Sequence, residues 1–516
     1  MTVETPEQHE ALMQALMSAE HWPQGGADRR RIDTHISTVI LAGDTAYKIK
    51  KPLDLGFLDF LSLESRRKAC LEELRLNGRL APRVYQTVCA ITGPIESPCI
   101  DGDGEVIDWA VQMRRFDPDA ILSNPATPLT MQIIDALADR VAEFHRTAAV
   151  CDPDEAFGSP DAAFGPMLQN FKQIIAFGAA DEQRLAGLNE WTTIQRDTLT
   201  PLLQQRKRDG HTRECHGDLH LGNVALIDGQ PVVFDAIEFN AGLRWIDTIN
   251  DLAFMTMDLQ ERGETAFKYR LLDRYLQHTG DYAALKLLRF YEVYRAMVRA
   301  KIAAIRLQQP LNDAEHSEVM ATFNRYVALA ETLTQEASGA LVIMMGVSGS
   351  GKSYAAHRLA DGLPAVRVRS DVERKRLLGV DARQDATALG AYSADLTERT
   401  YDCLRSRARE IIDAGYVAIA DATFLQREKR APFQALAKEL GVPYVIVDCD
   451  APVEVLQQRI VARQDDAANV SDADLQVLEK QLAARELLTE QEHPFSIAVR
   501  PDRPLPREAL RQMLIG

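Results

Sequence analysis

Two segments of the chain carry residue types that could hold a nucleoside triphosphate and a divalent cation. The first is His216-Gly217-Asp218-Leu219-His220-Leu221-Gly222-Asn223, and the second is Gly346-Val347-Ser348-Gly349-Ser350-Gly351-Lys352-Ser353. Proteins that transfer the γ-phosphoryl group of ATP use different sets of parts to hold ATP and Mg²⁺, and each segment contains one such set. The presence of both segments in one chain favours two fused nucleotide-using domains. This in turn favours a kinase over a simple ATP-binding protein.

In the first segment the spacing of three side chains suits metal-held ATP. Asp218 fits the base that orients an attacking hydroxyl, and Asn223 fits a metal ligand in the same loop. A second metal ligand is expected at the end of a nearby strand, and the apolar run Pro231–Phe234 ends in Asp235. The segment therefore predicts a base and two oxygen ligands around Mg²⁺.

This loop and the acid that follows it resemble the aminoglycoside phosphotransferase and choline kinase branch of the protein-kinase-like superfamily, over about residues 30–330. The resemblance implies a two-lobed α+β fold, in which Ala142–His145 precede the catalytic loop and Arg244, Asp247 and Asp251 lie in a segment that braces it. One departure is Glu238, which follows Asp235 closely and is read either as a further metal contact or as a solvated turn residue.

The same resemblance implies an ATP-binding lysine on the third strand of the small lobe. Lys48 is our choice, although Lys50 projects to the same face at the period of a strand. The lysine is expected to pair with a glutamate on the following helix, for which we select Glu72 while Glu73 stays open. Met113 begins the hinge expected against adenine.

The second segment follows an apolar strand and opens a helix, which is the context that a P-loop requires. Lys352 is expected to reach the β- and γ-phosphates, and Ser353 to bind Mg²⁺. The backbone that cradles the phosphates is assigned to Gly346, Ser348, Gly349, Ser350 and Gly351. Two further strands end in acids, Asp371 and Asp421.

The sequences Ser370-Asp371 with Arg374, and Asp421-Ala422-Thr423, resemble the small P-loop kinases near polynucleotide kinase and gluconate kinase. That resemblance implies Asp371 as general base, Arg374 as a grip on substrate phosphate, and Asp421 on Mg²⁺ or its waters. Arg459 and Arg463 resemble lid arginines that close over the transferring group. Their alternative reading is a pair of contacts on a solvated helix.

The elements that must position these residues follow from hydrophobic periodicity. Residues 1–335 read as the kinase-like domain, with helices at 1–20 and 61–80, strand pairs at 36–49 and 84–116, and a mostly helical stretch from 130. Residues 336–340 read as a linker, and 341–516 as an α/β domain with strands at 341–345, 365–369, 416–420 and 444–448. Alternating strands and helices predict a parallel sheet.

Bulk composition limits the compartment and the partners. The 516 residues are 46% hydrophobic and 26% charged, which is typical of a soluble globular protein of two or three domains. A net charge of −16 argues against bulk nucleic-acid or membrane-surface binding. Seven scattered cysteines without a CxxC pair, and an N-terminus unlike a signal peptide, favour a reducing cytoplasm.

These observations predict a bifunctional ATP- and Mg²⁺-dependent kinase that phosphorylates hydroxyl groups of small molecules. For the C-terminal domain the candidate acceptors also include nucleotides and polynucleotides. One alternative is a single catalytic domain whose companion is a regulatory nucleotide sensor. Another is a P-loop ATPase coupled to assembly or transport. Neither acceptor and no protein partner can be read from the residues.

Overall fold

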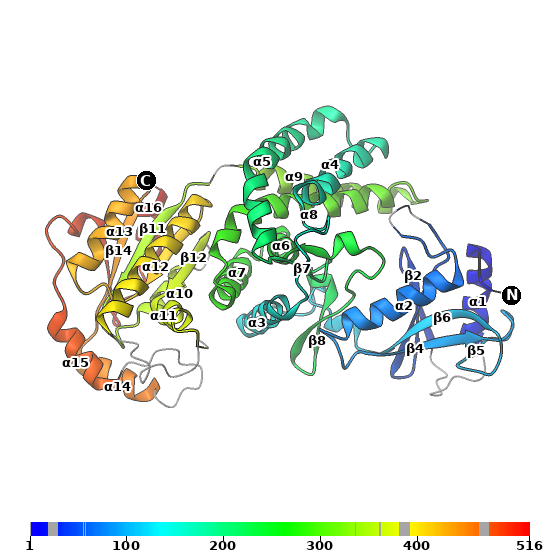
Figure 1. The fold of residues 1–516 in the computed structure, drawn as a ribbon, viewed down its shortest axis with the longest axis horizontal. Helices are drawn as coiled ribbons and strands as arrows, with labels where there is room; N and C mark the ends of the chain where they lie inside the picture. The colour runs from blue at the N-terminus through cyan, green and yellow to red at the C-terminus, as the bar shows by residue number, and fades with distance from the viewer. Residues whose placement is uncertain are drawn as a thin grey trace. The chain divides into compact units, whose positions relative to one another are not determined.

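The computed structural model describes residues 2–18, 29–54, 56, 58–335, 337–360, 363–380, 393–463 and 474–515, without the side chains of Arg463 and Ile515. By contacts the chain divides into two compact units. The first unit is Met1–Asp258 with Tyr294–Asn324, and the second is Leu259–Val293 with Arg325–Gly516. Each is treated by itself below (Figure 1).

The small lobe of the first unit is an antiparallel six-stranded sheet in the order β1-β2-β3-β6-β4-β5. Its strands are β1 (Arg29–Asp33), β2 (Ser37–Ala42), β3 (Thr45–Lys50), β4 (Tyr85–Thr92), β5 (Cys99–Ile100) and β6 (Val106–Arg114). Helix α1 (Pro6–Ser18) contributes Leu12, Met13 and Leu16 to the core on one face. Helix α2 (Leu63–Asn77) packs on β4 and β6. Both predicted strand pairs are present, with the inserted helix between them.

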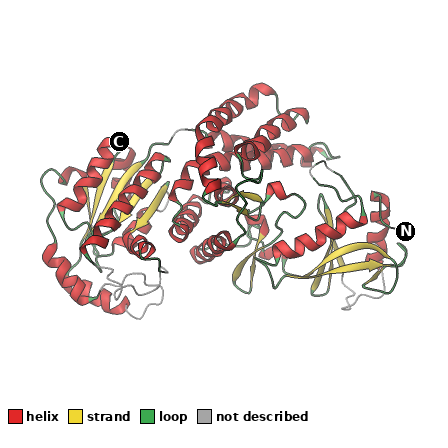
Figure 2. Cartoon of the chain, viewed as in Figure 1, coloured by secondary structure: helices red, strands yellow, loops and turns green. Residues whose placement is uncertain are grey.

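The larger lobe is mostly helical (Figure 2). Its helices are α3 (Met131–Thr147), α4 (Pro160–Ala176), α5 (Glu182–Arg208), α6 (Thr248–Glu261), α8 (Leu285–Arg306) and α9 (Asp313–Leu333), with 3₁₀ turns η1 (Pro118–Ala120), η2 (Leu221–Asn223) and η3 (Ala241–Leu243). Strand β7 (Thr212–Glu214) pairs antiparallel with β10 (Trp245–Asp247), and β8 (Val224–Ile227) pairs with β9 (Gln230–Val233). The two-lobed α+β class is confirmed.

The second unit contains the predicted parallel sheet, in the order β12-β13-β11-β14-β15. The strands are β11 (Ala340–Met345), β12 (Ala365–Arg369), β13 (Val417–Asp421), β14 (Tyr444–Cys449) and β15 (Ser496–Val499). Its helical segments are α7 (Thr265–Thr279), η4 (Tyr282–Ala284), α10 (Lys352–Ala360), α11 (Ser370–Leu377), α12 (Ala394–Asp413), α13 (Arg427–Leu440), α14 (Val453–Arg463), α15 (Leu475–Ala484), η6 (His493–Phe495) and α16 (Arg507–Ile515). All adjacent strands of this sheet pair in parallel.

Alternation along the central strand explains the layers. Ala340, Val342 and Met344 of β11 lie in one core cluster with residues of α10 and α16, while α12 and α13 pack on β11 and β13. The register pairs Asp421 with Met344 on one side and with Arg369 on the other. Because carboxyl ends of parallel strands share one edge, the P-loop, the β12–α11 corner and Asp421 meet there.

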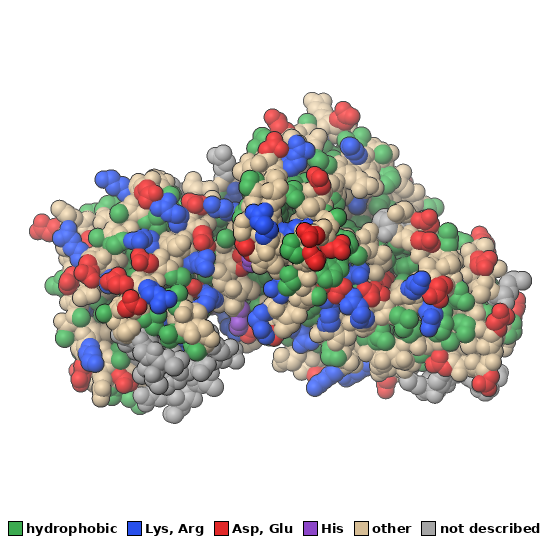
Figure 3. Space-filling view, viewed as in Figure 1, with side chains coloured by type: hydrophobic (Ala, Val, Ile, Leu, Met, Phe, Trp, Pro, Cys, Tyr) green, Lys and Arg blue, Asp and Glu red, His purple; other side chains and the backbone are tan. Residues whose placement is uncertain are grey.

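The charged side chains and the cysteines are distributed as follows in the structure. Acidic and basic side chains are interspersed on the face drawn in Figure 3. All seven cysteines are free. Among the described residues no helix combines the length and apolar character needed to cross a bilayer.

Two candidate active sites

The catalytic loop of the first unit is held by the ring of His216. Its Nε2 donates to the carbonyl of Phe234 at 2.9 Å, and its Nδ1 accepts from the backbone N–H of Asp218 at 3.2 Å. The N–H of Ile237 donates back to the carbonyl of His216 at 3.0 Å. The buried imidazole therefore ties the loop that bears Asp218 to the segment that bears Asp235.

Asp251 braces the same loop from α6. Its carboxylate accepts from the N–H groups of His216 and Gly217 at 3.0 and 2.8 Å, and lies 3.1 Å from Nε2 of His145. Burial would raise the pKa of Asp251, but the hydrogen bond from His145 and the nearby imidazoles lower it. Gly217 has φ +88°, and a Cβ there would meet the carbonyl oxygen of Leu243 at 2.8 Å, so the tight turn requires glycine.

Asp218 and Asn223 lie together, as the spacing predicts. Nδ2 of Asn223 donates to the carbonyl and to Oδ2 of Asp218, at 2.9 and 3.0 Å. Nε2 of His220 lies 3.4 Å from the same carboxylate oxygen. Desolvation opposes ionisation of Asp218, but His220, His216 and Arg295 bring its pKa below the ordinary value. The carboxylate is thus held charged and ready to accept a hydrogen bond from a hydroxyl.

Of the two candidate glutamates on α2, Glu73 is the one that contacts the lysines of β3. Nζ of Lys48 contacts Oε1 of Glu73 at 2.8 Å and also Asp235, and Nζ of Lys50 contacts Oε2 of Glu73 at 2.5 Å. Glu72, selected from the sequence, instead binds Arg75 and Arg244. One residue along a helix turns the side chain by about 100°, which places the two glutamates on different faces. Burial opposes ionisation of Glu73, but both lysines lower its pKa.

The position of Glu238 contradicts one of its two sequence readings, the solvated turn residue. Glu238 is 7% exposed and forms an ion pair with Lys50, which is fully buried. It is therefore a buried ion-pair partner of Lys50, and a further metal contact stays a prediction. Glu73 holds Lys48 on one oxygen and Lys50 on the other, so the two lysines share one carboxylate.

Asp235 and Asn223 fit a Mg²⁺ site by the chemistry of their donors. Carboxylate and amide oxygens are the hard ligands that Mg²⁺ prefers. Asp235 adopts φ +65°, its N–H donates to Oη of Tyr85 at 3.2 Å, and the next N–H donates to Oδ1 of Asn77 at 2.9 Å. Met113, the predicted hinge residue, lies on β6 opposite Ala46 and Tyr85.

In the second unit the P-loop has the geometry of a phosphate cradle. Gly346, Gly349 and Gly351 have φ of +144°, +82° and +92°. A Cβ on Gly346 would lie 2.3 Å from the carbonyl oxygen of Cys449, so a side chain cannot be placed there. Nζ of Lys352 donates to the carbonyl of Val347 at 2.9 Å, and Ser353 at the start of α10 is exposed.

Two buried oxygens beside the P-loop accept or donate no hydrogen bond among the described residues. They are Oγ of Ser350 and Oδ2 of Asp421, in residues that are each 5% exposed. A buried carboxylate oxygen without a partner is costly. A cation, or one of its waters, would satisfy the Asp421 oxygen, so the pair of Ser353 and Asp421 fits the predicted Mg²⁺ site.

The predicted base and the predicted phosphate grip both lie on α11. Nη1 of Arg374 donates to Oδ1 of Asp371 at 3.1 Å, so the predicted base and the predicted phosphate grip already touch. Arg459 of α14 donates to the carbonyl of Gly349 at 3.1 Å, which places it against the P-loop. Arg463 ends α14, and its side chain lies outside the described residues.

Three features of this site were missed in the sequence. Oε1 of Gln481 on α15 accepts from the N–H of Ser348 at 2.7 Å. A pocket of about 480 Å³ opens beside the P-loop, and Tyr354, Arg358, Arg459 and Arg500 are among its lining residues. Arg500 is anchored by Asp448 at 2.9 Å. Only the density of arginine after β15 signals this pocket, because its walls come from segments distant in sequence.

Comparisons with known proteins match two successive regions of the chain. The model of the phosphotransferase enzyme family matches residues 61–288, and an AAA domain model matches residues 341–488. Uncharacterized proteins of Mycobacterium bovis and of Mycobacterium tuberculosis are each 30% identical over 466 residues, which cover 88% of this chain and 89% of theirs. Two kinase-type regions therefore follow one another in this chain.

Solved structures are similar to one region or the other. Choline kinase from Cryptosporidium parvum is 9% identical, with a TM-score of 0.40, over 63% of this chain and 96% of that one. A sugar kinase from Janibacter is 22% identical, with a TM-score of 0.26, over 34% of this chain and 95% of that one.

Proposed function

The chain belongs to the same family as these mycobacterial proteins, and we propose that it is a bifunctional ATP-dependent kinase with one active site in each unit. The observation that supports this proposal is that each unit carries a lysine, a candidate base and a pair of side chains whose oxygens suit Mg²⁺. These are Lys48, Asp218, Asn223 and Asp235 in the first unit. They are Lys352, Asp371, Ser353 and Asp421 in the second.

In the first site Asp218 accepts the hydrogen bond of the attacking hydroxyl and orients its oxygen toward the γ-phosphate. Glu73 holds Lys48 so that its ammonium faces the ATP phosphates. Asn223 and Asp235 would hold Mg²⁺, which when bound neutralises charge on the phosphate oxygens. Met113 and the hinge after it would contact adenine.

In the second site the N–H groups of the P-loop and the ammonium of Lys352 bind the phosphates. Asp371 accepts the proton of the acceptor hydroxyl, and Arg374 exchanges its bond with Asp371 for one with an anionic substrate. Arg459 and Arg463 close over the transferring group. Ser353 and Asp421 would hold Mg²⁺, and the pocket lined by Tyr354 and Arg500 would take the rest of the nucleotide.

The acceptors we propose are hydroxyl groups of small molecules, extended at the second site to nucleotides or polynucleotide ends. An anionic acceptor fits the second site, because Arg374 lies beside the candidate base. No bulk nucleic acid is expected as a partner, since the chain carries a net charge of −16.

The test is a phosphorylation screen of a metabolite pool with γ-labelled ATP, using wild type, Asp218→Ala and Lys352→Ala. We expect each substitution to remove a different set of labelled products and to leave the other set unchanged. The double variant should label nothing.

Other outcomes would replace the proposal. If one substitution abolishes all labelling and the other none, one unit is a regulatory nucleotide sensor. If Lys352-dependent ATP hydrolysis yields no phosphorylated product across alcohols and nucleotides, the second unit is a P-loop ATPase.

A further inference from the structure

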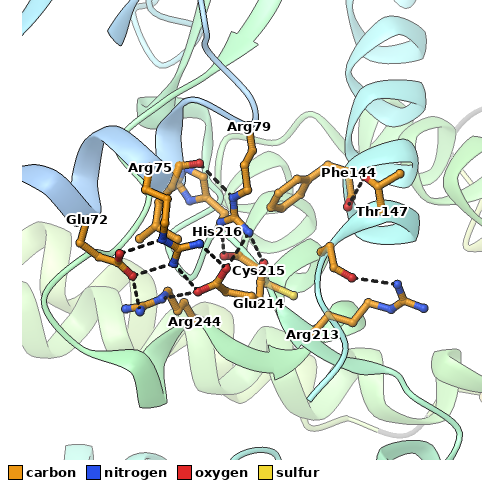
Figure 4. A network of polar contacts seen from close by, with 12 residues as sticks. Glu72, Arg75, Arg79, Phe144, Thr147, Arg213, Glu214, Cys215, His216 and Arg244 are labelled. Carbon is orange, nitrogen blue, oxygen red and sulfur yellow. Dashed lines mark hydrogen bonds and ion pairs between the residues drawn. The ribbon is translucent and has the colours of Figure 1, made fainter. Parts of the chain in front are cut away.

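A buried carboxylate with no part in the proposed chemistry lies immediately before the catalytic loop. Glu214, the last residue of β7, is 5% exposed. It accepts two hydrogen bonds from Arg75, at 2.6 and 3.0 Å, one from Arg79 at 3.2 Å and one from Arg244 at 3.3 Å. Figure 4 shows the three guanidinium groups converging on this one side chain. A bidentate pair of this kind fixes orientation as well as distance.

Glu72 completes the cluster on the side of α2. Its Oε1 accepts from Arg75 at 2.6 Å and from Arg244 at 2.7 Å. We call Glu72, Arg75, Arg79, Glu214 and Arg244 the arginine cluster. Three cations share two carboxylates, so loss of Glu214 would leave three guanidinium groups around one carboxylate. Arg244 is 7% exposed, which weakens solvent screening of that repulsion.

The cluster joins three parts of the first active site. Arg75 lies on α2, the helix that carries Glu73. Arg79 donates to the carbonyls of Glu214 and Cys215, at 2.8 and 3.4 Å, on the strand that leads to the catalytic loop. Arg244 donates to the carbonyl of Glu238 at 3.2 Å, in the segment after Asp235. The arginine cluster therefore connects the three segments that carry Glu73, Asp218 and Asp235.

The two neighbouring glutamates of α2 show what the cross-link sets. Glu73 points to Lys48 and Lys50, whereas Glu72 points to the arginine cluster. A helix held on both faces cannot rotate about its axis without breaking one set of contacts. The cluster thus sets the rotation of α2, on which the Glu73–Lys48 contact depends.

We propose that Glu214 is a positioning residue of the first kinase site: through Arg75, Arg79 and Arg244 it locks α2 to the catalytic loop and so keeps Lys48 in register with Asp218. The inference rests on the proposed function of that site. It assigns Glu214 no contact with ATP or acceptor.

The test compares Glu214→Gln with Glu10→Gln. Glu10 is the control because it also forms a bidentate pair with an arginine, Arg31, at 2.7 and 2.9 Å, although its side chain is 48% exposed. We measure Asp218-dependent turnover per folded molecule, well below the unfolding temperature. For Glu214→Gln we expect kcat to fall about 10- to 100-fold at saturating ATP. Lys352-dependent turnover, and all turnover of Glu10→Gln, should stay within about twofold of wild type.

Arg75→Gln guards against simple misfolding, because the Arg75 side chain is 50% exposed. If Arg75 and Glu214 act as one bridge, the double variant should be no slower than the slower single variant. Additive losses would overturn the proposal, as would a kcat of Glu214→Gln within about twofold of wild type.

A second readout needs no enzymatic activity, so it separates this inference from the proposed function. Hydrogen exchange of α2, residues 63–77, should accelerate in Glu214→Gln and not in Glu10→Gln. Unchanged exchange would overturn the inference even if the kinase is active. Faster exchange in a protein without Asp218-dependent turnover would support the lock and refute the proposed function.

Discussion

At the residue scale, the choice between Glu72 and Glu73 shows how a single position along α2 decides a partner. Lys48, Lys50 and Glu73 are all buried, and both lysines contact one carboxylate. Removal of that carboxylate would leave two ammonium groups facing only Asp235 and Glu238. Breaking a buried ion pair from one side is far costlier than loss of a partly exposed one.

We therefore expect Glu73→Gln to lower the free energy of unfolding of the first unit by about 3–5 kcal/mol and to abolish Asp218-dependent turnover. Glu64→Gln, on the exposed face of the same helix, should cost less than about 1 kcal/mol. Chemical denaturation with steady-state kinetics checks both. Equal stabilities of the two variants would contradict the central place given to Glu73.

Asp421 leads to a different prediction, because its buried Oδ2 accepts no hydrogen bond among the described residues and is proposed to bind Mg²⁺ or one of its waters. Asp421→Asn keeps the shape but removes the charge. The Mg²⁺ concentration that half-saturates Lys352-dependent turnover should rise about 10- to 100-fold. The temperature of thermal unfolding without Mg²⁺ should not decrease, because the substitution removes a buried carboxylate oxygen that accepts no hydrogen bond among the described residues.

The control for this experiment is Asp395→Asn, whose side chain is 84% exposed at the start of α12. It should leave the Mg²⁺ dependence unchanged. A normal Mg²⁺ requirement in Asp421→Asn would remove Asp421 from the proposed metal site.

Local contacts could be predicted from the sequence where a motif fixes the geometry of the backbone. Asp218 contacts Asn223, as their spacing predicts. Gly346, Gly349 and Gly351 of the P-loop have the positive φ angles that glycine favours. Spacing could not distinguish Glu72 from Glu73, because these neighbours lie on a helix that binds charged partners on two faces. Glu214 gave no signal, since its partners come from distant segments.

At the element scale, strands with buried apolar runs were predicted within a few residues, and polar or late elements were not. Strand β1 reads Arg-Arg-Arg-Ile-Asp and forms only because it pairs with β2. Strand β15 has four residues and joins the sheet through β14. Short elements of this kind depend on pairing partners that hydrophobic periodicity does not reveal.

The segment before β15 is anchored by a buried ion pair with a pH signature. Glu492 accepts from Nε of Arg430 at 2.6 Å, and Arg430 is 1% exposed. Desolvation would raise the pKa of Glu492, but bonds from Arg430 and Thr489 lower it to about 2. A lowered folded-state pKa stabilises the protein above the unfolded value of about 4.3, and this contribution is lost as the pH falls toward 2.

We therefore expect the second unit to lose stability between about pH 4.5 and pH 2, and Glu492→Gln to flatten that dependence. Hydrogen exchange of α13 at several pH values in this range measures it locally. Glu439→Gln, which removes an exposed pair with Arg409, should keep the wild-type slope. The same slope in Glu492→Gln would show that another group controls acid unfolding.

At the scale of the whole molecule, the contact-based units do not follow the sequence boundary placed at residues 336–340. The second unit includes Leu259–Val293, part of the segment that the phosphotransferase family model matches. Within that unit α7 covers β12, the edge strand of the parallel sheet. An open edge strand invites pairing with other chains, and a covering helix prevents it. Sequence periodicity cannot show which helix closes a sheet, because that contact joins distant segments.

Asp273 of α7 makes the decisive contact. Its Oδ1 accepts from the N–H of Arg367 on β12 at 2.8 Å, and its Oδ2 accepts from the guanidinium at 2.6 and 3.0 Å. Tyr282 donates to the carbonyl of Arg367 at 3.3 Å, so both backbone groups of that residue are satisfied by this helical segment. Asp273 is 7% exposed.

Asp273→Ala should therefore lower the free energy of unfolding of the second unit by about 3–5 kcal/mol, because it removes the ion-pair partner of a guanidinium that is 12% exposed and the acceptor of an edge N–H. Asp413→Ala is the matched control, since its pair with Lys286 also joins the 259–293 segment to the rest of the unit, but with side chains 33% and 42% exposed. It should cost less than about 1 kcal/mol. Hydrogen exchange of residues 365–369 and chemical denaturation measure the effect of each substitution. Equal effects of the two variants would mean that α7 lies on β12 without holding it, and that the P-loop region could be separated at residue 336 without loss of stability.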